Sequence, residues 1–140
     1  ETIEGYEYYG GLARNIAKSA ERLATRDKVE VPPGLRTLAD EAQRILRRAL
    51  DAFSEHDAER ATAVLGDDDQ VDADEDAVIR TAIEEIASHP EFTAQEVDFI
   101  LIAKNLERVA DHSTNIAEDV ILATKARNVK HAGKLAGTGI

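Results

Sequence analysis

The sequence has no cysteine and no tryptophan, and aromatic residues make up only 4% of it, so its core must be built from aliphatic side chains. The lack of cysteine excludes disulfide bonds and thiolate metal sites. Its longest apolar run, Phe99–Ala103, is far shorter than the ~20 residues that span a membrane, so we expect no membrane insertion. Glu1 is not preceded by an initiating Met or a signal-peptide pattern. We therefore expect a cytoplasmic protein and a chain taken from something longer.

The residues that are present favour helices and a folded core. Hydrophobic residues account for 43% of the chain, mostly Ala, Leu, Ile and Val, which is enough to drive folding. Ala and Leu are strong helix formers. The 28 acidic residues outnumber the 17 basic ones and give a net charge of −11, which repels nucleic acid and anionic membrane surfaces. We therefore expect no nucleic-acid partner, and instead cations or basic protein surfaces.

Apolar spacing predicts four helices and no sheet. Apolar residues recur at helical intervals up to about Arg26, from 35 to 53, from 57 to 88, and for about thirty residues from Thr93. The segment Val31–Gly34 contains two prolines and breaks the chain. Short connections between long helices predict an all-α fold, an antiparallel helical bundle. The second segment carries one apolar stripe, made of Leu35, Leu38, Ala42, Ile45, Leu46, Ala49 and Phe53.

Local signals predict where several helices begin and end. Asp57 is a predicted N-cap. Gly66 and the acidic residues after it are predicted to kink or interrupt the third helix, and His89-Pro90 to end it. Thr93–Glu96 has the pattern of a capping box at the start of the fourth helix. The tail from Lys125 is basic and rich in glycine, so we expect it to be loosely held.

The first and last helices share a sequence pattern. Glu7 and Asn15-Ile16-Ala17 recur as Glu107 and Asn115-Ile116-Ala117. A repeat at this spacing, in equivalent helices, indicates a duplicated helical unit of which only the last helix of the first copy is present. The repeated asparagines, Asn15 and Asn115, are candidates for hydrogen bonds between helices.

The fourth helix carries a resemblance to a known family. The segment Ala103–Glu118, which reads AKNLERVADHSTNIAE, strongly resembles the signature helix of the PhoU family. Gly10–Lys18 resembles the matching helix of the family's first repeat, and Asp68–Asp72 resembles its acidic stretch. The resemblance implies a PhoU-like three-helix repeat with one extra N-terminal helix. Its predicted parts are the last helix of an incomplete first repeat (1–30), a complete repeat (34–125) and a flexible basic tail (126–140).

Two pairs of carboxylates have the spacing of neighbours on one helix face. Glu107 and Asp111 lie four residues apart, as do Asp68 and Asp72, so within each pair the like charges repel. If the third and fourth helices pack antiparallel with these faces together, four carboxylates converge. Oxygen ligands suit Mg, Ca, Mn or oxidised Fe. The resemblance implies metal binding by such pairs, with Glu107, Asp111, Asp68 and Asp72 as the metal ligands and Fe, Mn, Zn or Mg as the ions.

A plainer interpretation competes with this one. Acidic pairs on helices are most often solvated surface, and Asp111 has Arg108 three residues before it as a partner. Where the family's first repeat usually has an acid, this chain has Gly11, so Glu7 lacks its partner and a second metal site is in doubt. His112 reads as a surface or capping histidine, with a ligand role as the lesser alternative.

Three classes of function remain open on the sequence. The resemblance implies a regulatory adaptor of bacterial phosphate homeostasis, which negatively regulates phosphate-starvation signalling and phosphate transport. Its implied partners are a sensor histidine kinase and the ATPase of a phosphate ABC transporter. The alternatives are a metal-cluster enzyme and a structural bundle that forms a homodimer. Because no residue set has the spacing of a known catalytic motif, we expect no enzymatic activity.

Overall fold

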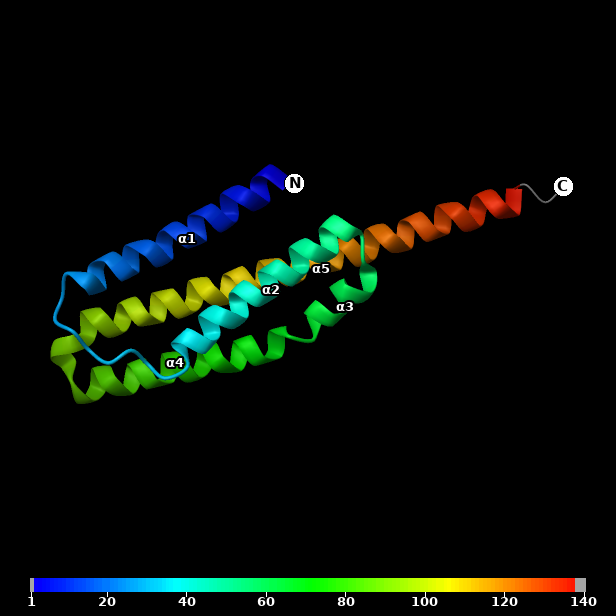
Figure 1. Ribbon diagram of the computed structural model, residues 1–140. Helices are drawn as coiled ribbons and strands as arrows, with labels where there is room; N and C mark the ends of the chain where they lie inside the picture. The colour runs from blue at the N-terminus through cyan, green and yellow to red at the C-terminus, as the bar shows by residue number, and fades with distance from the viewer. Residues whose placement is uncertain (1, 138–140) are drawn as a thin grey trace.

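The computed structural model describes residues 2–137, and within that range it is helical with no strand. The predicted all-α fold is therefore confirmed. Successive long helices run in opposite directions, so that α1 and α4 both lie antiparallel to α5, as Figure 1 shows. No helix in the described range is long and apolar enough to cross a membrane. The elements are α1 (Thr2–Ala24), α2 (Leu35–Glu55), α3 (Ala58–Leu65), α4 (Asp68–Ser88), the 3-10 turn η1 (Pro90–Phe92) and α5 (Thr93–Gly137).

The core is a stripe of aliphatic side chains shared by α2, α3, α4 and α5. On α2, Leu38 and Ile45 are fully buried, and burial of such a side chain stabilises the fold by roughly 1.5–3 kcal/mol. Their helical spacing puts them on one face, as predicted. Phe53 was predicted to continue that stripe, but it is 48% exposed. It lies in the last turn of α2, where Ala52 takes the buried position instead.

The third predicted helix is two helices that meet at Gly66 and Asp67. The predicted N-cap is confirmed, because the Asp57 side chain accepts a hydrogen bond from the Arg60 amide at 3.0 Å. The predicted interruption at Gly66 is also confirmed. Asp67 accepts a hydrogen bond from Arg48 of α2, which fixes the junction against the bundle.

The turn between α4 and α5 contains one 3-10 turn. α4 ends before His89-Pro90, as predicted, and Pro90 starts η1, which leads without a gap into α5. The Thr93 hydroxyl donates to the Pro90 carbonyl oxygen at 2.6 Å and does not cap the helix. The capping-box prediction is wrong here, because the 3-10 turn already provides helical backbone before Thr93.

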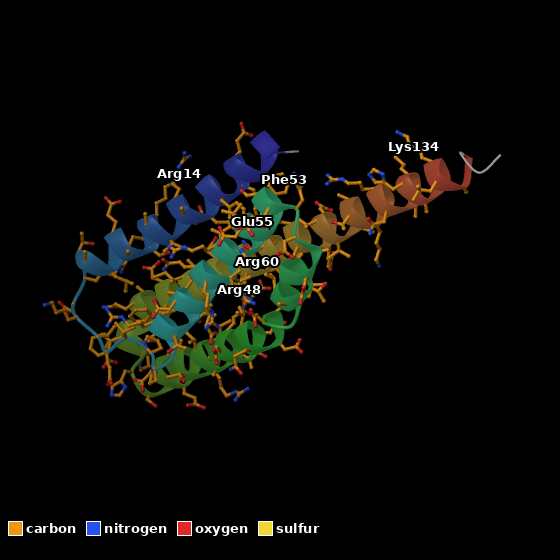
Figure 2. All side chains as sticks on the ribbon, turned by 45° about the vertical axis from the view of Figure 1, so that its right-hand side comes forward. Arg14, Arg48, Phe53, Glu55, Arg60 and Lys134 are labelled. Atoms are coloured by element: carbon orange, nitrogen blue, oxygen red, sulfur yellow. The ribbon has the colours of Figure 1, made fainter. Side chains whose placement is uncertain are left out.

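α5 is much longer than predicted. Its first thirty or so residues pack on α1, α2, α3 and α4, and every residue from Lys125 to Gly137 is exposed. The basic segment from Lys125 was predicted to be a loose tail, whereas the structure continues the helix through it to Gly137. Ala, Lys and Arg are strong helix formers and no proline interrupts them. Figure 2 shows Lys134 on this part of α5, which projects past the other helices.

α1 is held on α5 by matched polar contacts. Leu12 is buried, and Tyr9 hydrogen-bonds to Ser113 of α5 at 2.9 Å. Asn15 donates to Asn105 at 3.3 Å, so its predicted inter-helix bond is confirmed, although Asn115 is exposed. Near the other end of α1, Arg22 donates to Asp98 at 2.7 Å and 2.9 Å. The residue numbers of the partners on α5 decrease as those on α1 increase, which is the register of an antiparallel pair.

Candidate functional site: a carboxylate cluster between α4 and α5

The two predicted carboxylate pairs lie on facing helices. Asp68 and Asp72 occupy the first turns of α4, and Glu107 and Asp111 occupy the middle of α5. Because residues four apart share a helix face, each pair presents both of its carboxylates together. α4 packs antiparallel on α5 (Figure 1), and the charges of Asp68 and Asp72 both act on Glu107.

Electrostatics show that the four carboxylates form one group. The pKa of Glu107 is raised from its ordinary value of 4.5 to about 7. Burial is the main cause, followed by the negative charges of Glu75, Asp111, Asp72 and Asp68. The structure thus brings all four predicted site residues into one electrostatic neighbourhood.

Asp68 of this group combines a raised pKa with a buried carboxylate oxygen that has no hydrogen-bond partner. Burial raises its pKa, and the charges of Asp72, Asp111 and Asp69 raise it further. Its Oδ1 atom is buried without a hydrogen-bond partner. An unpartnered buried carboxylate oxygen is costly, so a bound cation at this position would relieve both the missing contact and the repulsion.

Glu75 is a fifth member of the cluster and was not among the predicted ligands. It is the largest charge contribution to the raised pKa of Glu107. The pKa of Glu75 is itself raised, first by burial and also by Asp76 and Asp72, whereas Lys104 and Arg108 lower it. The signal was available in the sequence, because Asp68, Asp72 and Glu75 follow a 4–3 spacing that keeps all three on one helix face.

The competing interpretation of Asp111 as an exposed residue agrees with the geometry, but its pairing with Arg108 does not. In the described part of the chain, no ion pair joins Arg108 to Asp111, and the Arg108 charge acts on Glu75 instead. Asp111 is exposed, as expected for surface, yet its charge reaches both Glu107 and Asp68. It therefore lies at the solvent edge of the cluster.

The donor atoms suit a hard cation, but as placed the carboxylates do not converge on a single coordination position. They offer only oxygen, the donor that Mg²⁺, Ca²⁺, Mn²⁺ and oxidised iron prefer. The orphaned Asp68 oxygen and the protonation-prone Glu107 also fit an ion. Over residues 2–137, no three His, Asp or Glu side chains lie close enough together to hold a metal ion as placed. Coordination would need these side chains to turn towards each other.

A second group of acids lies across α4, against α2, where arginines lie nearby, although the Glu41 Oε2 atom is also buried without a hydrogen-bond partner. The pKa of Glu41 is raised mainly by burial and then by the neighbouring carboxyl of Asp74, whereas Arg44 lowers it. Asp67 pairs with Arg48. This side of α4 therefore has a direct ion pair, whereas on the side that faces α5 the charges of Lys104 and Arg108 act on Glu75 without an ion pair among the described residues.

His112 is neither a surface histidine nor a helix cap. It is half-buried between α5 and α1, with its ring centroid 4.6 Å from that of Tyr8 and 5.0 Å from that of Tyr9. The tyrosines come from a helix about a hundred residues earlier in the chain, so the sequence around His112 could not reveal them. Glu7 is exposed on α1, and at Gly11 no atom lies within 4 Å of an added Cβ, so space alone does not exclude an acid there.

The fold and the cluster define a small helical domain whose two long antiparallel helices share a carboxylate-lined face. The family model of the PhoU domain matches residues 35–120, the stretch that contains all five carboxylates. The chain belongs to the PhoU domain family.

Similarity to individual proteins agrees with this assignment. The phosphate-specific transport system accessory protein PhoU homolog of Pseudomonas aeruginosa is 31% identical over 136 residues, which cover 95% of this chain and 55% of the relative. The corresponding protein of Caulobacter vibrioides is 33% identical over 113 residues (80% and 49%), and homolog 1 of Thermotoga maritima is 31% identical over 125 residues (89% and 54%). The chain thus spans about half the length of the curated relatives it matches. No solved structure matches it with comparable significance.

Proposed function

We propose that the chain is part of a regulatory adaptor of bacterial phosphate homeostasis. In this proposal it lowers phosphate-starvation signalling and phosphate transport through contacts with a sensor histidine kinase and with the ATPase of a phosphate transporter. The supporting observation is the match to relatives named as accessory proteins of the phosphate-specific transport system. The strongly acidic chain suits basic patches on such partners, because complementary charge speeds association.

We further propose that the carboxylate cluster binds metal ions and that the bound ions modulate these contacts. Five facing carboxylates, a Glu107 pKa of about 7 and the unpartnered Asp68 oxygen support this proposal. Glu107, Asp111, Asp68, Asp72 and Glu75 would hold the ion, which would supply positive charge to a face that has too little. We prefer regulation to catalysis, because the nearest imidazole, His112, packs against tyrosines.

Ion binding is tested by counting retained metal. The chain would be purified without an affinity tag, exposed separately to Fe, Mn, Zn, Mg and Ca, dialysed, and measured by mass spectrometry of the elements. The double variant Glu107→Gln with Asp111→Asn removes two cluster charges. The control, Glu118→Gln with Asp119→Asn, removes two exposed charges from the same helix. Metal retained by the wild type and control but lost from the cluster variant supports the proposal, and equal retention in all three contradicts it.

The adaptor function is tested separately by partner binding. The cytoplasmic part of the kinase and the transporter ATPase would each be immobilised, and the chain passed over them with and without the metal that it retains. Saturable binding to either partner supports the adaptor. Absence of binding to both, by a chain shown to be folded by circular dichroism, would count against it whatever the metal result. Binding that is unchanged by metal would support the adaptor function and contradict the proposal that the ion modulates it.

A further inference from the structure

A second acidic site lies at the end of the bundle where α4 turns into α5. A pocket of about 420 Å³ opens there between the linker after α1, the end of α4, η1 and the first turn of α5. Figure 1 shows that linker and turn at the same end of the molecule. Glu96 of α5 and Glu85 of α4 line the pocket. Glu96 is 11 residues, or about 16 Å of helix, before Glu107, so the pocket is separate from the carboxylate cluster.

Glu96 is buried without the partner that its chemistry requires. The residue is 3% exposed, and its Oε2 atom has no hydrogen-bond partner. Burial, followed by the charge of Glu85, raises the pKa of Glu96. A carboxylate oxygen held in this way costs stability unless a positive or donating group meets it. The pocket is the space beside Glu96 from which such a group could approach.

The walls of the pocket combine apolar and polar side chains, and their apolar part favours an organic cation over a bare metal ion. The apolar part is made of Val29, Val31, Pro32, Pro33 and Phe92. Three glutamates, Glu30, Glu85 and Glu96, line the rest with Lys28, Thr81 and His89, and the His89 Nδ1 atom lies 3.5 Å from Glu85 Oε2. Arginine and lysine side chains combine an aliphatic stem, which suits such walls, with a charged head, which suits the carboxylates. The Phe92 ring offers a further surface for a cation. As at the carboxylate cluster, no three described ligand side chains converge here as placed, so the choice of an organic cation rests on the apolar part of the wall.

We propose that this pocket binds an arginine or lysine side chain presented by a partner protein. The charged head reaches Glu96 and Glu85, and the stem lies against the linker and Phe92. The overall charge of −11 favours a basic partner. This inference goes beyond the proposed function, because it assigns a ligand class to a pocket that the carboxylate cluster does not include. It requires neither metal nor a role in phosphate signalling.

Binding is tested with small probes on the full chain, by nuclear magnetic resonance titration. The probe is a blocked tripeptide with arginine at its centre, and the matched control probe replaces arginine by uncharged citrulline. We expect shifts confined to residues around Glu96, His89 and Phe92, and an affinity for the arginine peptide at least about tenfold higher than for the citrulline peptide, as a charge-assisted hydrogen bond provides. Equal affinities, or shifts elsewhere on the molecule, would overturn the proposal.

Variants assign the binding to the pocket. Glu96→Gln preserves the shape of the side chain and is expected to weaken arginine-peptide binding by about tenfold or more. Glu84→Gln, an exposed neighbour on α4 outside the pocket lining, is expected to change nothing. If Glu96→Gln fails to fold, Glu85→Gln at an exposed position provides the same test. Lys28 also lines the pocket as an internal cation, so Lys28→Gln is expected to strengthen binding. Affinity unchanged in the folded glutamate variants would refute the site.

A free amine is distinguished from a protein side chain by agmatine, which carries a guanidinium on an aliphatic stem without a peptide backbone. Peptide binding as tight as agmatine binding supports a side chain from a partner, because the pocket mouth then admits a backbone. Agmatine binding without peptide binding would show that the ligand is a free amine and would overturn the partner assignment.

Discussion

α5 buries polar groups on two faces and treats them in opposite ways. Towards α1, each buried polar side chain has a matched partner: Asp98 accepts hydrogen bonds from Arg22, and Ser113 hydrogen-bonds to Tyr9. Towards α4, carboxylates face carboxylates, and Glu107 is left with a pKa of about 7. Matched contacts hold the two helices together. Unmatched charges weaken the fold, and the proposed bound cation would offset them.

The largest expected effect breaks the matched face. In Arg22→Met the aliphatic stem remains, but Asp98, whose side chain is 4% exposed, loses its ion pair. We expect the largest fall in the free energy of unfolding among these variants, with α1 released first, as measured by denaturant unfolding and hydrogen exchange along α1. Arg26→Met, at an exposed position after the end of α1, is the control and is expected to be neutral. A loss of the same size in the control would mean that Asp98 does not depend on Arg22.

The second prediction relieves the unmatched face. Glu107→Gln removes a charge whose pKa is raised on folding from 4.5 to about 7. A raised carboxyl pKa makes the native state lose stability as pH rises from about 4.5 to about 7, and the penalty is complete above that range. We therefore expect the metal-free variant to be about 1–2 kcal/mol more stable than the wild type at pH 8, and equal to it near pH 4.

Thermal unfolding at both pH values measures this difference. Glu118→Gln, exposed on the same helix, is expected to match the wild type throughout. A Glu107→Gln variant that is less stable at pH 8 would show that the carboxylate is satisfied in the native state, and the contrast between the two faces would disappear.

The smallest expected effect sharpens the comparison on the matched side. Tyr9→Phe removes the hydroxyl that hydrogen-bonds to Ser113 and leaves the ring against His112. The expected loss is about 0.5–1 kcal/mol, because Ser113 retains its bond to the Val109 carbonyl at 2.6 Å. Denaturant unfolding measures it. A gain in stability would show that the Tyr9–Ser113 hydrogen bond does not stabilise the fold, contrary to its place on the matched face.

The sequence predicted those parts of the fold that depend on neighbouring residues. The burial of Leu38 and Ile45, the cap at Asp57 and the interruption at Gly66 all follow from spacing and local chemistry. The length of α5 did not, because the segment after Lys125 has good helix formers but no partner helix to reveal its state.

The candidate site, like the fold, was predictable only where its residues are related by local helical spacing. The four acids at i and i+4 could be found by helical spacing, and Glu75 would have followed from extending the same face by three residues. The surroundings of His112 and the pocket at Glu96 could not, since each combines segments that are distant in the chain. Which distant segments meet is decided by tertiary packing and not by local pattern.

The uninterrupted course of α5 makes it a lever. Its fulcrum is the packed portion around Glu107, and its long arm is the exposed portion that ends at Gly137, about 45 Å away along the helix axis. A tilt of about 5° at the fulcrum would move the tip by about 4 Å over that length. Any event that draws the carboxylates together and tilts α5 would therefore produce a larger displacement at the basic end of the helix.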